Sequence, residues 1–133
     1  GASLVHACEW NPEAIEALRW GLESNGVDHR CVVHEGDSRE TSQSLEETAD
    51  RVFLGLLPSS EDGLEAALRV LKPDGGTLHI HGLAPSSDHF SWAEGVVASA
   101  SAIRPYSCVR TALVRVKSYA PHWDHVVLDI SLA

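Results

Sequence analysis

The feature that most constrains the fold is the stretch Val5–Ala14, where a short apolar run ends in one carboxylate and a helix start follows directly. The run Leu4–Cys8 is apolar except at His6, which predicts a strand covered on both faces. Ligands of open α/β sheets bind outside the carboxyl ends of the strands, where an acidic side chain can accept hydrogen bonds from ribose hydroxyls. The pattern therefore predicts an α/β fold with Glu9 as a nucleoside-binding residue, the alternative being an ordinary solvated acid.

A helix from Pro12 to Ser24 is predicted by the signals at its two ends. Asn11 is a favourable N-cap, proline suits the first helical position, and Asn25-Gly26 supplies a left-handed stop. Its expected buried stripe consists of Ile15, Leu18 and Leu22.

A second apolar run, Cys31–His34, follows this helix and ends in Glu35-Gly36-Asp37. A strand, a helix and a second strand in this order should close as a right-handed parallel unit. Asp37 then lies at the ligand-facing end of its strand, as Glu9 does, unless it serves as a helix or turn cap.

The alternation of strands and helices continues along the chain and changes only near its end. The expected elements are a buried strand Val52–Leu57, a helix capped by Ser59 or Ser60, a strand Thr77–His81, and a helix near Ser91–Ile103. The last two apolar runs, Cys108–Lys117 and His125–Leu132, have no helix between them and must pair as an antiparallel hairpin. Residues 1–133 are therefore predicted to form a single α/β domain with a mostly parallel sheet and a C-terminal antiparallel hairpin.

Composition narrows the class of protein. No apolar run approaches the roughly 20 residues of a membrane span, and no charged-then-apolar leader is present, which predicts a cytoplasmic protein. Cys8, Cys31 and Cys108 are an odd number without C-x-x-C spacing, so we expect reduced core residues. The chain has eight histidines, but their spacing completes no tetrahedral ligand set, and no metal site is predicted.

Several segments together carry a resemblance that spans nearly the whole chain. They are His6–Pro12, Asn25–Cys31, His34–Asp37, Leu54–Glu61, Gly76–His81, Val116–Pro121 and His125–Asp129. On these segments the chain resembles the class I S-adenosylmethionine-dependent transferases, and among them the tRNA wybutosine-synthesising aminocarboxypropyl transferases and the related tRNA guanine-N1 methyltransferases. The combination of Leu-Gly-Leu-Leu-Pro-Ser-Ser with Ser-Tyr-Ala-Pro is its most specific part.

The resemblance implies a Rossmann-like class I methyltransferase fold and S-adenosyl-L-methionine as co-substrate, with no metal. By this resemblance Glu9 would bind the ribose hydroxyls and Asp37 would face the adenine edge, and Gly36 would be a further cofactor-binding residue. Trp10 would lie beside the adenine, although a plain packing role is equally open.

The acceptor side is expected on the loop that follows the strand ending near Leu57. By the same resemblance Leu57 and Pro58 would contact the cofactor, while Ser59 and Ser60 would line the acceptor side or act as helix caps. The implied reaction transfers the 3-amino-3-carboxypropyl group to a wybutosine-precursor guanosine next to the anticodon of phenylalanine tRNA. Alternatives are guanine-N1 methyl transfer and a non-catalytic remnant or interaction piece of this fold, and no general base can be assigned.

Charge bears on the expected tRNA partner. The net charge of −9 argues against a self-sufficient nucleic-acid binder, because phosphate neutralisation drives most such affinity. The segment 95–123 nevertheless has no acidic residue and contains Arg104, Arg110, Arg115 and Lys117. Arg110 and Arg115 are therefore predicted to contact tRNA. Most of the affinity for tRNA is expected from regions upstream of this chain. The alternative is that these cations simply solvate an exposed strand.

The resemblance also places a first strand and a glycine-rich loop before Gly1. That strand would be central in the sheet, between the strands that end at Glu9 and Leu57. We therefore expect this chain to bind cofactor poorly unless the upstream residues are present. Alternatively, the two flanking strands close the gap and give a smaller sheet.

Overall fold

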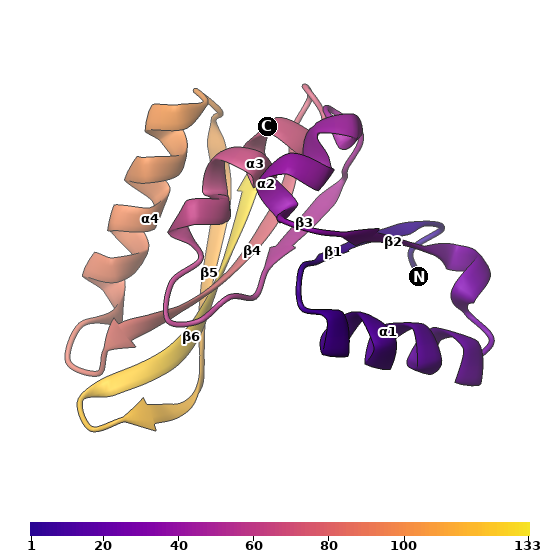
Figure 1. The fold of residues 1–133 in the computed structure, drawn as a ribbon. Coiled ribbons are helices and arrows are strands. Elements are labelled where there is room, and N and C mark those ends of the chain that lie inside the picture. The colour runs from indigo at the N-terminus through magenta and orange to yellow at the C-terminus, as the bar shows by residue number, and fades with distance from the viewer. The chain divides into compact units, whose positions relative to one another are not determined.

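The computed structural model describes residues 1–133, which form two compact units, Gly1–Ser44 and Leu45–Ala133 (Figure 1). Each unit has a sheet of its own: β1 and β2 form a two-stranded sheet, and the other four strands form a sheet in the order β3-β4-β6-β5. The alternative in which the strands flanking the expected gap join one smaller sheet is therefore wrong, because β1 and β3 belong to different sheets.

The first unit is the predicted strand-helix-strand. Its elements are β1 (Val5–Glu9), α1 (Pro12–Ser24), β2 (Cys31–Glu35) and α2 (Ser38–Thr41), with 3-10 turns at Asp28–Arg30 and Ser42–Leu45. The strands β1 and β2 run parallel, with Glu9 opposite Glu35. Both predicted ends of α1 are confirmed, since Asn11 Oδ1 accepts a hydrogen bond from Glu13 N at 3.0 Å and Gly26 has φ +64°.

Burial in this unit is lower than predicted. Ile15 is buried, but Leu18 and Leu22 are only half-buried. The expectation of a strand covered on both faces is wrong, because Leu4 and Val5 are 51% and 46% exposed. Two strands and one long helix leave much of the apolar surface of β1 without a covering element.

The second unit contains a mixed sheet that ends in an antiparallel hairpin, as predicted. Its elements are β3 (Arg51–Leu54), a 3-10 turn (Glu61–Gly63), α3 (Leu64–Val70), β4 (Gly76–Pro85), α4 (His89–Ile103), β5 (Cys108–Ala120) and β6 (Trp123–Leu132). The pair β3 and β4 is parallel, whereas β4 with β6 and β6 with β5 are antiparallel. The strand expected to reach Leu57 ends at Leu54, and the hairpin turn is only Pro121-His122.

The main hydrophobic core lies in this second unit. Side chains of α3 and α4 pack against alternate residues of β4 and β6. The largest fully buried side chains are Leu68, Leu71, Leu78, Val126, Leu128 and Ile130. Because alternate strand residues point to opposite faces, this packing gives β4 and β6 one core face and one half-buried face.

The structure can be compared with the predictions for the cysteines and for membrane-spanning helices. All three cysteines are free thiols. Cys8 and Cys31 are half-buried, but Cys108 is exposed, so the prediction that all three are core residues is wrong. Cys108 begins β5, an edge strand whose residues are nearly all exposed. None of the helices combines the length and the apolarity that a membrane crossing requires.

Candidate functional site

Glu9 lies at the carboxyl end of β1, directly before the start of α1. Its Oε1 accepts hydrogen bonds from Trp10 N at 3.0 Å and from Asn11 N at 2.9 Å. The other oxygen, Oε2, has no protein partner. The backbone therefore fixes the carboxylate and leaves one oxygen able to accept hydrogen bonds from a ligand hydroxyl.

Two neighbours of Glu9 suit the approach of a flat ligand. Trp10 is 72% exposed, so its ring offers a large apolar surface beside the carboxylate. Gly36 donates from its N to the Glu9 carbonyl oxygen at 2.9 Å and has φ +131°. A Cβ at Gly36 would be strained by this φ and would lie 3.2 Å from Thr41 Cγ2. The predicted residues Glu9, Trp10 and Gly36 are thus brought together at the ends of β1 and β2.

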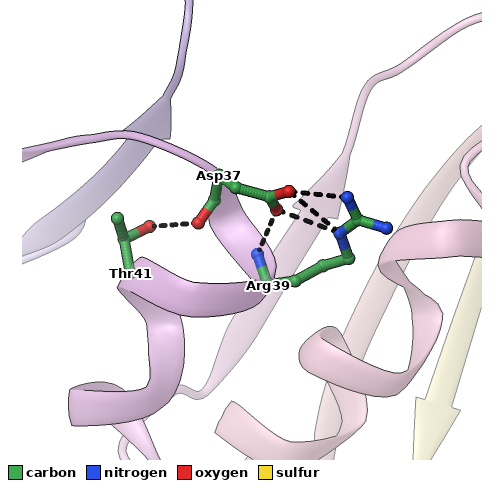
Figure 2. Close-up of polar contacts among 3 residues, drawn as sticks. All are labelled: Asp37, Arg39 and Thr41. Carbon is green, nitrogen blue, oxygen red and sulfur yellow. Dashed lines mark hydrogen bonds and ion pairs between the residues drawn. The ribbon is translucent and has the colours of Figure 1, made fainter.

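Asp37 serves as the N-cap of α2, and Figure 2 shows its contacts with Arg39 and Thr41. Its Oδ1 accepts from Arg39 N at 2.9 Å and from Nε at 3.0 Å, while Oδ2 accepts from Nε at 3.1 Å and Nη2 at 2.6 Å. These hydrogen bonds from Arg39 lower the pKa of Asp37 to about 2.

The cap interpretation of Asp37 is therefore confirmed. The four contacts come from three N–H groups of Arg39, because Nε–H is shared between the two carboxylate oxygens. A carboxylate has about four lone-pair sites, so a further donor would have to share this carboxylate with Arg39.

The loop after β3 carries the predicted residues Leu57, Pro58, Ser59 and Ser60. The Leu57-Pro58 peptide bond is cis, and Pro58 O accepts from Leu83 N of β4 at 3.3 Å. Ser59 Oγ accepts from Glu61 N at 3.2 Å, but the N-cap position of the Glu61–Gly63 turn is Ser60, so Ser59 is not the cap. For Ser60 the capping prediction is also wrong, because its side chain caps no helix and instead lies buried among backbone carbonyls.

A pocket adjoins this loop within the second unit. It is lined by Ser59, Ser60, Glu61, Leu64, Ile80, His81, Gly82, Trp92, Val96 and Ser99. The indole of Trp92 packs so closely on Gly82 that a Cβ there would lie 2.3 Å from Trp92 Cζ2. Our sequence reasoning missed both residues; a glycine inside the apolar run of β4 was the available signal, because it marks a close approach.

The predicted basic patch contains two engaged and two free side chains. Arg115 donates to the buried Asp124 at 2.9 and 3.3 Å, and this hydrogen bonding is the main cause that lowers the pKa of Asp124. Arg104 donates to the carbonyl oxygen of Leu68 at 2.8 Å. Arg110 and Lys117 on β5 are exposed and make no side-chain hydrogen bond or ion pair.

Two histidines of β4 contact side chains of β6. His79 Nδ1 lies 2.6 Å from Asp129 Oδ1, and His81 Nδ1 lies 2.9 Å from His125 Nε2. No three His, Cys, Asp or Glu side chains are grouped so that they could hold a metal ion.

Comparisons with known proteins agree on one family. The model of the TRM5/TYW2 methyltransferase domain matches residues 1–102 and so includes residues of both units. The chain is 46% identical over 134 residues to the Arabidopsis thaliana tRNA wybutosine-synthesizing protein 2/3/4, covering 97% of this chain and 13% of that protein. It is 39% identical to the Danio rerio tRNA wybutosine-synthesizing protein 2 homolog, covering 97% of this chain and 40% of that protein.

A solved structure gives the same result for the fold. The crystal structure of M. jannaschii TYW2 in complex with AdoMet matches with a TM-score of 0.89 and 25% identity. The match covers 98% of this chain and 57% of that chain. The chain thus spans well under two thirds of each of these three proteins.

Proposed function

The chain belongs to the TRM5/TYW2 methyltransferase domain family, and from this premise we propose that it is the S-adenosylmethionine-binding part of a tRNA aminocarboxypropyl transferase. The observation that carries the proposal is Glu9, which stands at the end of β1 with one carboxylate oxygen free. The chain also matches TYW2 in complex with AdoMet over 98% of its length. The proposed reaction is transfer of the 3-amino-3-carboxypropyl group to the wybutosine-precursor guanosine next to the anticodon of phenylalanine tRNA.

We assign the cofactor-binding roles to residues at the ends of strands. Glu9 Oε2 accepts from the ribose hydroxyls, and the exposed ring of Trp10 covers the adenine. The backbone at Gly36 leaves room for the adenine, and Asp37 accepts from the adenine amino group beside its contacts with Arg39. Leu57 and Pro58 contact the methionine half.

The chemistry requires few protein groups. The sulfonium of S-adenosylmethionine already activates its three attached carbons, so the chain must bind it and present one carbon to the acceptor. Transfer forms a bond between the acceptor carbon and the side-chain carbon of the methionine moiety and breaks that carbon's bond to sulfur. The sulfur leaves as the neutral thioether methylthioadenosine, and the acceptor carbon releases its proton to solvent. The loop carrying Ser59 and Ser60 is the part of this chain that we assign to the acceptor.

Guanine-N1 methyl transfer is the second candidate, because the same family model covers both kinds of protein. Two observations favour aminocarboxypropyl transfer. The relatives reported above carry the name tRNA wybutosine-synthesizing protein. The segment Leu54–Ser60 also differs from the Asn-Leu-Pro type that we associate with the methyltransferase.

The deciding experiment labels the two ends of the methionine moiety separately. The complete protein that contains this chain is incubated with precursor-bearing phenylalanine tRNA and S-adenosylmethionine labelled at the methyl or at the carboxyl carbon. We expect only the carboxyl label in tRNA, and loss of that signal in Glu9→Gln. Methyl label in tRNA would establish the methyltransferase instead, and absence of both labels would indicate a non-catalytic role.

The tRNA contact proposed for this chain rests on the exposed edge strand. Arg110 and Lys117 are its free cations, whereas Arg115 is engaged by Asp124. Charge reversal of Arg110 in the complete protein should weaken tRNA binding and reduce the slope of its salt dependence by about 1. An unchanged slope would reject the contact.

We also propose a cytoplasmic location, which is consistent with three free thiols.

A further inference from the structure

Ser60 is one of the few buried polar residues in the chain, with 5% of its surface exposed. Three backbone carbonyl oxygens lie within hydrogen-bonding distance of its Oγ. They belong to Leu56 at 2.9 Å, His81 at 3.0 Å and Leu54 at 3.1 Å. All four residues are in the Leu45–Ala133 unit.

The three carbonyls come from different parts of the backbone. Leu54 is the last residue of β3, Leu56 is in the loop that follows, and His81 is in β4. The hydroxyl has one proton, which it donates to one of these oxygens or shares among them. A single buried side chain thus ties the end of β3, the following loop and the neighbouring strand together.

A second contact holds the same loop against β4. Leu83 N donates to Pro58 O at 3.3 Å. Leu57 and Ser59, which we assign to the methionine half and to the acceptor, are the neighbours of Pro58 in this loop. The hydrogen bonds of Ser60 and Pro58 therefore hold the part of the loop that contains both residues.

We propose that Ser60 is a positioning residue for the transfer reaction: its buried hydroxyl fixes the Gly55–Ser59 loop, which in turn holds the acceptor guanosine against the reacting carbon. This inference rests on the function proposed above. Ser60 acts through the loop and does not itself touch substrate. A shift of about 1 Å in a positioning element reduces the rate roughly 100-fold, so the loop conformation should control turnover.

The test compares substitutions of Ser60 in the complete protein. Ser60→Ala removes the donor that the three carbonyls share, whereas Ser60→Thr retains the hydroxyl and Ser60→Cys retains a weak donor of similar size. Ser42→Ala is the matched control, because Ser42 is also buried but lies outside the loop and the assigned binding residues. The readouts are kcat and KM for tRNA, calorimetric affinity for S-adenosylmethionine, and hydrogen exchange of the loop amides.

We expect Ser60→Ala to lower kcat roughly 10- to 100-fold and to speed the exchange of the loop amides. The affinity for S-adenosylmethionine should fall by a smaller factor, because Leu57 and Pro58 belong to the same loop. Ser60→Thr should recover most of kcat, and Ser42→Ala should keep the wild-type value. If Ser60→Ala does not fold, Ser60→Cys decides. Its kcat should be lower than that of the wild type, and an unchanged kcat would contradict the proposal.

The results distinguish failure of the proposed function from failure of the inference about Ser60. A wild-type protein that transfers no group would overturn the proposed function and this inference with it. An active wild type whose Ser60 variants all keep its kcat would overturn this inference alone.

Discussion

The two units of the chain differ in how they hold their side chains in place. Ile15 is the one buried apolar residue of Gly1–Ser44, whereas the second unit contains all the others, including the fully buried Leu68 and Leu71. In the first unit the side chain of Glu9 is held by two backbone amides next to the start of a helix. A carboxylate at a strand end can thus be fixed by local hydrogen bonds, while a sheet face needs a packed core. Substitutions should accordingly change ligand affinity in the first unit and stability in the second.

The largest effect is expected from truncating the core of the second unit. Leu68 is 1% exposed, and Leu68→Ala should lower the free energy of unfolding by about 2–5 kcal/mol, because it removes buried apolar contacts and leaves a cavity. Leu18→Ala, at a half-buried position of α1, should cost clearly less. Urea denaturation measures both, and equal losses would contradict the contrast between the units.

Glu9→Gln should produce the largest effect on binding. Hydrogen bonds to a charged group contribute about 1.5–3 kcal/mol, so the affinity of the complete protein for S-adenosylmethionine should fall roughly 10- to 100-fold. Glu35→Gln is the control, since Glu35 is opposite Glu9 in the ladder and makes an exposed ion pair with Arg19. Calorimetric titration of both variants gives the comparison. A similar loss for Glu35→Gln would reject a specific role for Glu9.

Two glycines of the second unit differ in the space around them, and replacing each with alanine compares a closely packed position with an open one. Gly82→Ala places a Cβ against the Trp92 ring and should cost about 1–3 kcal/mol of stability. Gly95→Ala, in α4, has no neighbour within 4 Å and should stabilise the helix by about 0.5–1 kcal/mol. Thermal unfolding of the two variants measures opposite shifts of the midpoint. Shifts of the same sign would show that Trp92 moves aside at little cost.

The smallest expected effect is the dependence of stability on pH. Each unit contains one cross-strand histidine pair that contributes to it. Burial, followed by the charge of the partner histidine, lowers the pKa of His81 and of His6. The unfolded chain therefore binds more protons than the folded one between the lowered pKa and about 6.5. Stability should fall as the pH drops below about 6.5 and level off once the folded pKa is passed.

Replacing one histidine of each pair tests this dependence. His81→Gln and His6→Gln should each flatten the decline of the thermal midpoint between about pH 7 and pH 5. An unchanged slope in both variants would show that other groups set the pH dependence.

Local sequence signals predicted the local structure well. The helix from Pro12 to Ser24 has the predicted bounds, because its cap at Asn11 and its stop at Gly26 act within one turn. The hairpin was predictable because no helix separates its two strands, and its pairing then follows from the short turn. The position of Glu9 at the end of β1 was predictable because an apolar run precedes it and a helix start follows it.

Long-range contacts account for the predictions that failed. The apolar run at Leu4 and Val5 predicted burial, but burial requires a covering element from elsewhere in the chain. The sequence predicts Ser60 as a helix cap, yet its hydrogen bond to His81 O joins residues 21 positions apart. The packing of Trp92 on Gly82 likewise has no local signature beyond a glycine in a strand.

The sequence by itself determined the order of helices and strands, the caps of α1, the acid at the end of β1 and the family, because each depends on residues close together in the chain or on patterns that can be read in order. Only the tertiary structure decided that Arg39 occupies the Asp37 carboxylate, that Asp124 engages Arg115, and that the Ser60 hydroxyl lies among three carbonyls. The physical reason is that hydrogen bonding and burial depend on which atoms are neighbours in space, and the folded backbone sets those neighbours.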